Sequence, residues 1–205
     1  MMIPDELKTL QDAYAWINAV LADGRSFANR LDDLIKSNTA PLPLVIYSQR
    51  DPQWASLTLG TGATTIGQEG CLMTCAAQML TECGTIMRPD ALNSWLKSNS
   101  GFTQGNHFIF ASIDKLNAVK FRMLGNCVNV PAPMSVLEAV IKSGAYIIAQ
   151  VDFVPGGSIQ QHWVLYRGDG KITDPWYGDD ASITRYGKDA ATAIIGYVIY
   201  DRVKP

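Results

Sequence analysis

Apolar and small side chains recur at alternating intervals of three and four residues over residues 5–37. This spacing predicts one long amphipathic helix, or two abutting helices if Asp23-Gly24 interrupts it. The heptad-like seam consists of Leu7, Leu10, Tyr14, Ile17, Leu21, Gly24, Ala28, Leu31 and Ile35. Two interpretations are open: the helix packs against its own domain, or it is an arm through which the chain forms a homo-oligomer or joins a virion assembly.

Turn-forming residues at 37–43 separate this helix from the rest of the chain. We therefore expect a helical arm with its linker over residues 1–40 and a second domain over residues 41–205. The expected elements of the second domain are a short strand at 44–47, helices from 71 to about 84, from 89, at 111–116 and at 135–143, a loop at 101–106, and strands at 146–151, 162–167, 171–174 and 193–200. Because the strands are grouped at the end, the order predicts an α+β domain with a largely antiparallel sheet.

The composition is that of an ordinary globular protein. Of the 205 residues, 47% are hydrophobic and 18% are charged, and the formal net charge of −2 gives no reason to expect nucleic-acid binding. We expect no membrane span, because no apolar run is long enough, and we see no signal peptide at the N-terminus. The expected place of synthesis is the cytoplasm, with action on a virion or after export by another route left open.

The four cysteines are irregularly spaced and do not form the pattern of a disulfide framework, and no Cys/His cluster has the spacing of a zinc site. We expect no metal and no organic cofactor. Cys71 stands out because it follows the glycine-bracketed turn Gly67–Gly70 and begins a predicted helix. Unpaired backbone N–H groups and the helix dipole favour a thiolate at such a position. Cys71 is thus a candidate nucleophile, and a buried structural cysteine is the alternative.

A cysteine nucleophile usually needs a histidine as general base, and the chain has only His107 and His162. His162 begins a predicted strand, and Asp174 ends the strand that pairs with it across the turn at Gly168–Gly170. Antiparallel pairing places the two side chains opposite or diagonal to each other, within reach of a hydrogen bond. Either residue alone is readily explained as a strand-end or turn residue, but together with Cys71 they make up a catalytic triad. His107 has no acid placed to orient it and is expected to line a cleft or the surface.

An acyl-transfer site also needs donors for the oxyanion that forms during the reaction. The backbone N–H of Cys71 is one, and the side-chain amide of Gln49 or of Gln68 is the candidate for the second. We favour Gln49, because it lies on a separate segment that can fold over the site. Gln68 lies in the tight turn just before the cysteine and can point away.

These residues belong to a set of motifs with a family resemblance. The motifs, in order, are Tyr47–Trp54, Thr65–Gly67, Gly70-Cys71 with its helix, Pro89–Trp95, His162–Val164 and Asp174-Pro175-Trp176. Together they resemble the papain-like cysteine peptidase superfamily. Within it, the chain is most similar to the bacteriocin-processing (double-glycine) peptidase-like group, family thirty-nine of the cysteine peptidases. The resemblance covers residues 44–200, leaves residues 1–40 uncovered, and implies a papain-like fold.

The resemblance implies that Cys71 is the nucleophile, His162 the base, Asp174 the residue that orients it, and Gln49 the oxyanion donor. It also implies that Trp176 shields the bond between the histidine and the acid. The spacing between Gln49 and Cys71 is longer than in papain.

The expected function is hydrolysis of a peptide or related amide bond, with no cofactor. The expected substrate is a peptide or a peptidoglycan-like cell-wall peptide, in a phage or secreted setting. Two alternatives from other classes are a catalytically silent structural or binding module of a larger assembly, and an acyl transferase that uses the same triad.

Overall fold

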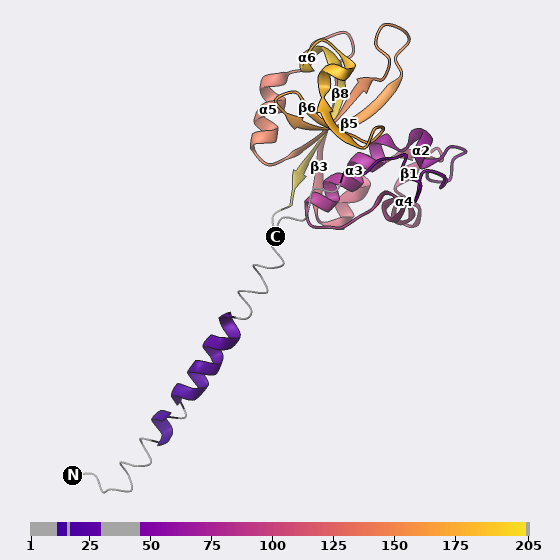
Figure 1. Cartoon of the computed structure of the whole chain (residues 1–205). Helices are drawn as coiled ribbons and strands as arrows, with labels where there is room; N and C mark the ends of the chain where they lie inside the picture. The colour runs from indigo at the N-terminus through magenta and orange to yellow at the C-terminus, as the bar shows by residue number, and fades with distance from the viewer. Residues whose placement is uncertain (1–11, 16, 30–45, 204–205) are drawn as a thin grey trace, which may run out of the picture. The chain divides into compact units, whose positions relative to one another are not determined.

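The computed structural model describes residues 12–15, 17–29 and 46–203 (Figure 1). The chain divides into two compact units, Met1–Pro43 and Leu44–Pro205. The predicted domain boundary between residues 40 and 41 lies outside the described residues and stays a prediction.

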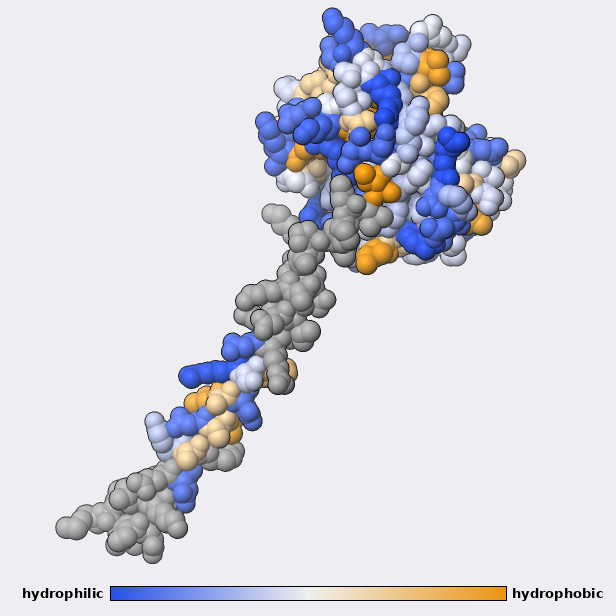
Figure 2. Space-filling model, viewed as in Figure 1, coloured by the Kyte–Doolittle hydropathy of each residue, from blue (hydrophilic) through white to orange (hydrophobic). Residues whose placement is uncertain are grey.

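The described residues of the first unit, 12–15 and 17–29, are helical. They confirm the middle of the helix predicted from the seam, whereas residues 5–11, 16 and 30–37 lie outside the described part. The seam residues Tyr14, Ile17 and Leu21 are exposed, and Figure 2 shows apolar and charged side chains together on this helix. Both interpretations of the seam stay predictions.

The second unit combines an antiparallel sheet with several helices. Its helices are α2 (Ile66–Glu69), α3 (Cys71–Glu82), α4 (Pro89–Ser98), α5 (Met134–Lys142) and α6 (Ala190–Ala193), with 3₁₀ helices η1 (Phe110–Leu116) and η2 (Ile183–Tyr186). Its strands are β1 (Phe102–Thr103), β2 (His107–Phe108), β3 (Val119–Asn126), β4 (Tyr146–Asp152), β5 (Gln161–Gly168), β6 (Lys171–Asp174), β7 (Asp179–Ser182) and β8 (Ile194–Arg202). Six strands form one sheet in the order β3-β8-β4-β5-β6-β7, with every neighbouring pair antiparallel, and β1 pairs with β2 separately. The predicted α+β class is confirmed.

The helices of the structure bear on the expected absence of a membrane span. None of those in the described ranges is both long and apolar enough to cross a bilayer.

Both faces of the sheet are buried, which explains why its central strands are almost continuously apolar. Successive residues point to opposite faces. Ile148 and Leu165 pack in the core that includes α3 and α4, whereas Ile147 and Val164 pack in the core that includes α5 and α6. Figure 1 shows α2–α4 gathered on one side of the sheet and α5 and α6 on the other. Because α3 lies against β5 and β4, the helix with Cys71 is fixed beside the strand with His162.

The turn between β5 and β6 sets the position of His162 relative to Asp174. Its two central residues, Asp169 and Gly170, have φ values of 50° and 72°, as a two-residue Asp-Gly hairpin turn requires. One β-bulge then shifts the register along the hairpin. His162 and Asp174 are consequently diagonal rather than directly opposite, the second of the two arrangements that the sequence predicts.

The second unit differs from the expected elements in several parts. Helix α2 occupies most of the expected glycine-bracketed turn, because a capping box at Thr65 starts a helix there. Ile46 and Tyr47 are not in a strand, because the Tyr47 N–H donates to the side chain of Gln78 in α3 (2.9 Å) instead of to a sheet. The expected loop at 101–106 includes β1, which pairs with β2. Strands β3 and β7 are not predicted by the sequence pattern, because many of their residues are exposed and the apolar alternation is weak.

Candidate active site

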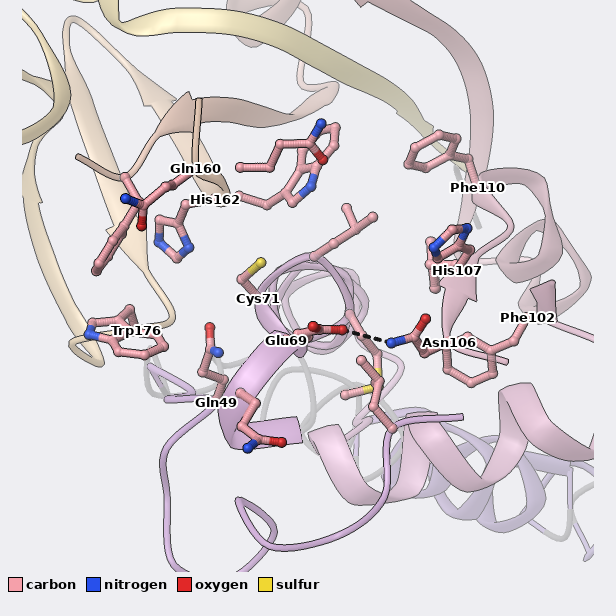
Figure 3. Close-up of a pocket in the computed structure, with 18 residues that line it drawn as sticks. Gln49, Glu69, Cys71, Phe102, Asn106, His107, Phe110, Gln160, His162 and Trp176 are labelled. Atoms are coloured by element: carbon pink, nitrogen blue, oxygen red, sulfur yellow. Dashed lines mark hydrogen bonds between the residues drawn. The ribbon is translucent and has the colours of Figure 1, made fainter. Parts of the chain in front are cut away.

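Cys71 is the first residue of α3, and Gly70 is its N-cap. Helix α2 ends immediately before it, and a Cβ on Gly70 would lie 2.4 Å from the carbonyl oxygen of Ile66. Glycine is therefore required where the two helices meet. Cys71 is 9% exposed, and it lines the same cleft as His162, which Figure 3 shows beside it. The thiol thus lies at a helix start, where backbone N–H groups and the dipole favour an anion.

His162 and Asp174 form a buried acid–base pair. The Nε2 atom of the imidazole lies 3.0 Å from Oδ1 of Asp174, and the two side chains are 4% and 0% exposed. Because the carboxylate engages Nε2, Nδ1 is the ring nitrogen left for the thiol of Cys71. The structure therefore brings together three predicted residues from α3, β5 and β6.

The surroundings of His162 favour its charged form. Burial lowers the pKa of the imidazole, but the hydrogen bonds to Asp174 and Cys71 and the negative charges of these partners raise the pKa to about 9. The imidazolium is then the main form at neutral pH. A positive ring beside the sulfur stabilises the thiolate that a nucleophile requires.

Asp174 accepts hydrogen bonds from three further donors. Its Oδ2 accepts from Arg185 (2.9 Å) and from the Tyr186 hydroxyl (2.5 Å), and its Oδ1 accepts from the Trp176 backbone N–H (3.0 Å). Burial raises the pKa of Asp174, but the hydrogen bonds, first that of His162 and then that of Tyr186, outweigh burial and hold the pKa below its usual value. The carboxylate is thus ionised and fixed in orientation. The sequence does not predict Arg185 or Tyr186, because they lie in η2 and no local motif connects them to the hairpin.

Aromatic rings pack around the imidazole. The ring centroids of Phe153 and Tyr186 lie 5.3 and 5.6 Å from that of His162. Trp176, to which the resemblance assigns the shielding, packs against Phe153 at 5.2 Å. The rings beside His162 are therefore those of Phe153 and Tyr186, with Trp176 extending the aromatic cluster.

Gln49 reaches the site, but its amide is not oriented as an oxyanion donor. Its backbone N–H donates to the Pro175 carbonyl (2.8 Å), which ties this loop to the segment after Asp174. Its side chain is buried and points toward Cys71 (Figure 3). Nε2 donates to the Gly67 carbonyl (3.1 Å), and Oε1 has no hydrogen-bond partner among the described residues. Half a turn of the amide would exchange the two atoms. The position of Gln49 suits the predicted oxyanion donor, but its N–H group would face the site only after this rotation.

Gln68, the other candidate donor, is used locally. Its Oε1 accepts from the backbone N–H of Thr65 (2.9 Å), the reciprocal contact of a capping box at the start of α2. The side chain is exposed and belongs to the lining of the cleft. This contact favours Gln49 over Gln68 as the residue beside the thiol.

Cys71 and His162 line a cleft of about 730 Å³, whereas Asp174 is fully buried and lies outside its lining. The walls of the cleft are formed by Gln49, Leu59, Gln68, Glu69, Cys71, Leu72, Met73, Phe102, Asn106, His107, Phe108, Phe110, Phe153, Gln160, Gln161, His162, Trp163 and Trp176. Figure 3 shows His162 on the Trp176 side of Cys71 and close to it, whereas His107 lies on the opposite side and farther away. His162 is therefore the histidine beside the thiol. Within the described ranges, no three His, Cys, Asp or Glu side chains are grouped to hold a metal ion.

Comparisons with known proteins do not assign a family. No protein-family model and no curated protein matches the chain. Among solved structures, the chain is similar to the crystal structure of a candidate C39-like peptidase from Bacillus anthracis, with 14% sequence identity and a TM-score of 0.43, over 78% of this chain and 96% of that chain. Any functional assignment therefore depends on the geometry of the site.

Proposed function

We propose that the second unit is a papain-like cysteine peptidase or amidase that acts through Cys71, His162 and Asp174. The observation that carries this proposal is the hydrogen bond between a buried carboxylate and an imidazole that lines the same cleft as a thiol at the start of α3. The motif resemblance to papain-like peptidases supports the same assignment.

Acylation begins with the thiolate of Cys71. The sulfur attacks the carbonyl carbon of the scissile bond, a C–S bond forms, and the π electrons of the carbonyl move to its oxygen. The backbone N–H of Cys71 donates to this oxyanion, and Nε2 of Gln49, after rotation of its amide, is the second donor. The C–N bond then breaks as the carbonyl re-forms, and the imidazolium of His162 gives its proton to the leaving amine.

Deacylation releases the acid product. The neutral imidazole of His162 takes a proton from water as the water oxygen attacks the thioester carbon. The C–S bond breaks, the carboxylic acid leaves, and the thiolate and imidazolium are restored. Asp174 remains ionised throughout and keeps the ring oriented.

The proposal is tested with a library of internally quenched peptides. We expect cleavage by the wild-type protein and its loss, to background, in Cys71→Ala. Cys75→Ala is the matched control: Cys75 lies one turn further along α3, is buried, and its thiol donates to the Trp163 carbonyl (3.5 Å), so its removal should leave the activity in place. Cleavage that survives in Cys71→Ala would contradict the proposal.

A bacterial cell-wall peptide is the substrate class that the resemblance favours. Incubation with purified peptidoglycan of different cross-link types should release new amino groups in proportion to enzyme. Product analysis separates hydrolysis from acyl transfer, because a hydrolase releases a free carboxylic acid whereas a transferase joins the acyl group to a second amine. If library peptides are cut but no wall type releases amines, the cell-wall substrate is wrong.

A further inference from the structure

The cleft contains one carboxylate that the mechanism does not use. Glu69 comes two residues before Cys71, and Figure 3 shows its side chain between Cys71 and Asn106. Its Oε2 accepts hydrogen bonds from Nδ2 of Asn106 (2.7 Å) and from the hydroxyl of Thr64 (2.9 Å). Both donors engage the same oxygen, which leaves Oε1 available to a ligand.

The charge of Glu69 is not offset along this part of the cleft. Lys and Arg are absent from the described residues that line it, and the imidazolium of His162 is engaged by Asp174 and the thiol. The guanidinium of Arg50 lies over the ring of Trp176 (4.9 Å). Figure 3 shows Trp176 and Glu69 on opposite sides of Cys71. The end of the cleft beyond Glu69 is therefore negative, and it would attract a cation.

Aromatic side chains line the cleft on the Asn106 side of this carboxylate, where Figure 3 shows Phe102 and Phe110. Phe102, Phe108 and Phe110 line the same end of the cleft, and each is half-buried. The rings of Phe108 and Phe110 meet edge-on at 6.2 Å. A carboxylate and half-buried rings in one cleft match a group with an aliphatic stem and a charged ammonium end, since the stem can pack on the rings while the ammonium reaches the acid.

We propose that Glu69, Asn106 and the three phenylalanines form a specificity subsite for a primary ammonium group of the substrate. The ammonium belongs to a lysine-like side chain or to a free amino terminus. Glu69 supplies the charge, and Asn106 holds its carboxylate in place. This inference rests on the proposed function, because only an acyl substrate of Cys71 would place its ammonium here.

Dipeptide chloromethyl ketones test the subsite, because their reaction with a thiol beside an imidazolium reports the binding of a peptide next to Cys71. There are three matched probes. The first has lysine with an acetylated amino terminus and a free side-chain ammonium, the second has norleucine with an acetylated amino terminus, and the third has norleucine with a free amino terminus. The measurement is the rate of Cys71 alkylation, read by peptide mass spectrometry. One of the two cationic probes should react about fivefold faster than acetylated norleucine, as one partly screened charge pair allows, and the faster one identifies the source of the ammonium.

The matched variant is Glu69→Gln, which keeps an oxygen for Asn106 and Thr64 but removes the charge. It should abolish the preference without slowing acetylated norleucine. Asp201→Asn, which removes one negative charge outside the cleft lining, should leave the preference intact. Raising the salt from about 0.05 to about 0.5 M should weaken the preference in the wild-type protein, which gives a test that does not depend on the folding of a variant.

The outcomes separate the two proposals. Rapid alkylation without a preference for a cationic probe, or a preference that survives in Glu69→Gln, overturns the subsite and leaves the role of Cys71 intact. Alkylation of Cys71 by all probes no faster than that of glutathione overturns the proposed function, and the subsite with it.

Discussion

The two sides of His162 are built differently. On one side, Asp174 is fully buried and accepts hydrogen bonds from the imidazole, an arginine, a tyrosine and a backbone N–H. On the other side, the ring faces Cys71, which is held mainly by its place at the start of α3 and opens into the cleft. The contrast teaches that the fold fixes the proposed orienting residue firmly, while it leaves the proposed nucleophile free to meet a substrate.

Breaking the fixed side should have the largest effect. Asp174→Ala leaves the guanidinium of Arg185 and the hydroxyl of Tyr186 without their buried partner, and we expect a loss of about 3–5 kcal/mol in the free energy of unfolding. Activity should fall at least about a hundredfold, because the imidazole loses its orientation. Asp174→Asn, which retains an acceptor for Nε2, is the matched variant and should lose less of both. Urea unfolding and peptide cleavage measure the two effects, and a stable, active Asp174→Ala would contradict the account of this side.

The open side is probed by the two glutamines. Gln49→Ala removes the proposed second oxyanion donor, and we expect the cleavage rate to fall about a hundredfold to a thousandfold. Gln68→Ala removes only the capping contact with Thr65 and should keep the rate near that of the wild type. The reverse result would exchange the roles of the two glutamines.

A smaller change sharpens the comparison within the fixed side. Tyr186→Phe removes one hydrogen bond to a buried carboxylate that keeps its other donors, so we expect a loss of about 2 kcal/mol in the free energy of unfolding. Tyr177→Phe is the control, since the Tyr177 side chain is exposed and its ring can still stack with Arg185. Equal free energies of unfolding for the two variants would mean that the hydrogen bond from Tyr186 to Asp174 does not stabilise the protein.

The site could be predicted from the sequence where its signals are short in range. Gly70 and the apolar spacing after it place Cys71 at a helix start, and the Asp-Gly turn places Asp174 near His162. These patterns involve neighbours along one helix or one hairpin, and the α+β class follows from the order of such patterns.

The rest depends on contacts between distant segments. The bond between Asn106 and Glu69 joins residues 37 apart in the chain, and that between Tyr47 and Gln78 joins residues 31 apart. The orientation of the Gln49 amide depends on backbone carbonyls that only the folded turn at α2 presents. No periodicity or local motif predicts contacts between such distant residues. The donors around Asp174 and the subsite carboxylate are therefore visible only in the structure.

The most direct test of the central claim is the alkylation of Cys71 by limiting iodoacetamide in the native protein, over roughly pH 6–8, below the pKa of an ordinary thiol. The pKa of His162, about 9, keeps the imidazolium in place across this range. We therefore predict fast labelling of Cys71 that persists toward the lower pH and slows in His162→Ala. Cys83, which is more exposed than Cys71, serves as the internal reference for an unactivated thiol. Labelling of Cys71 no faster than that of Cys83, and unchanged by His162→Ala, would contradict the thiolate–imidazolium pair.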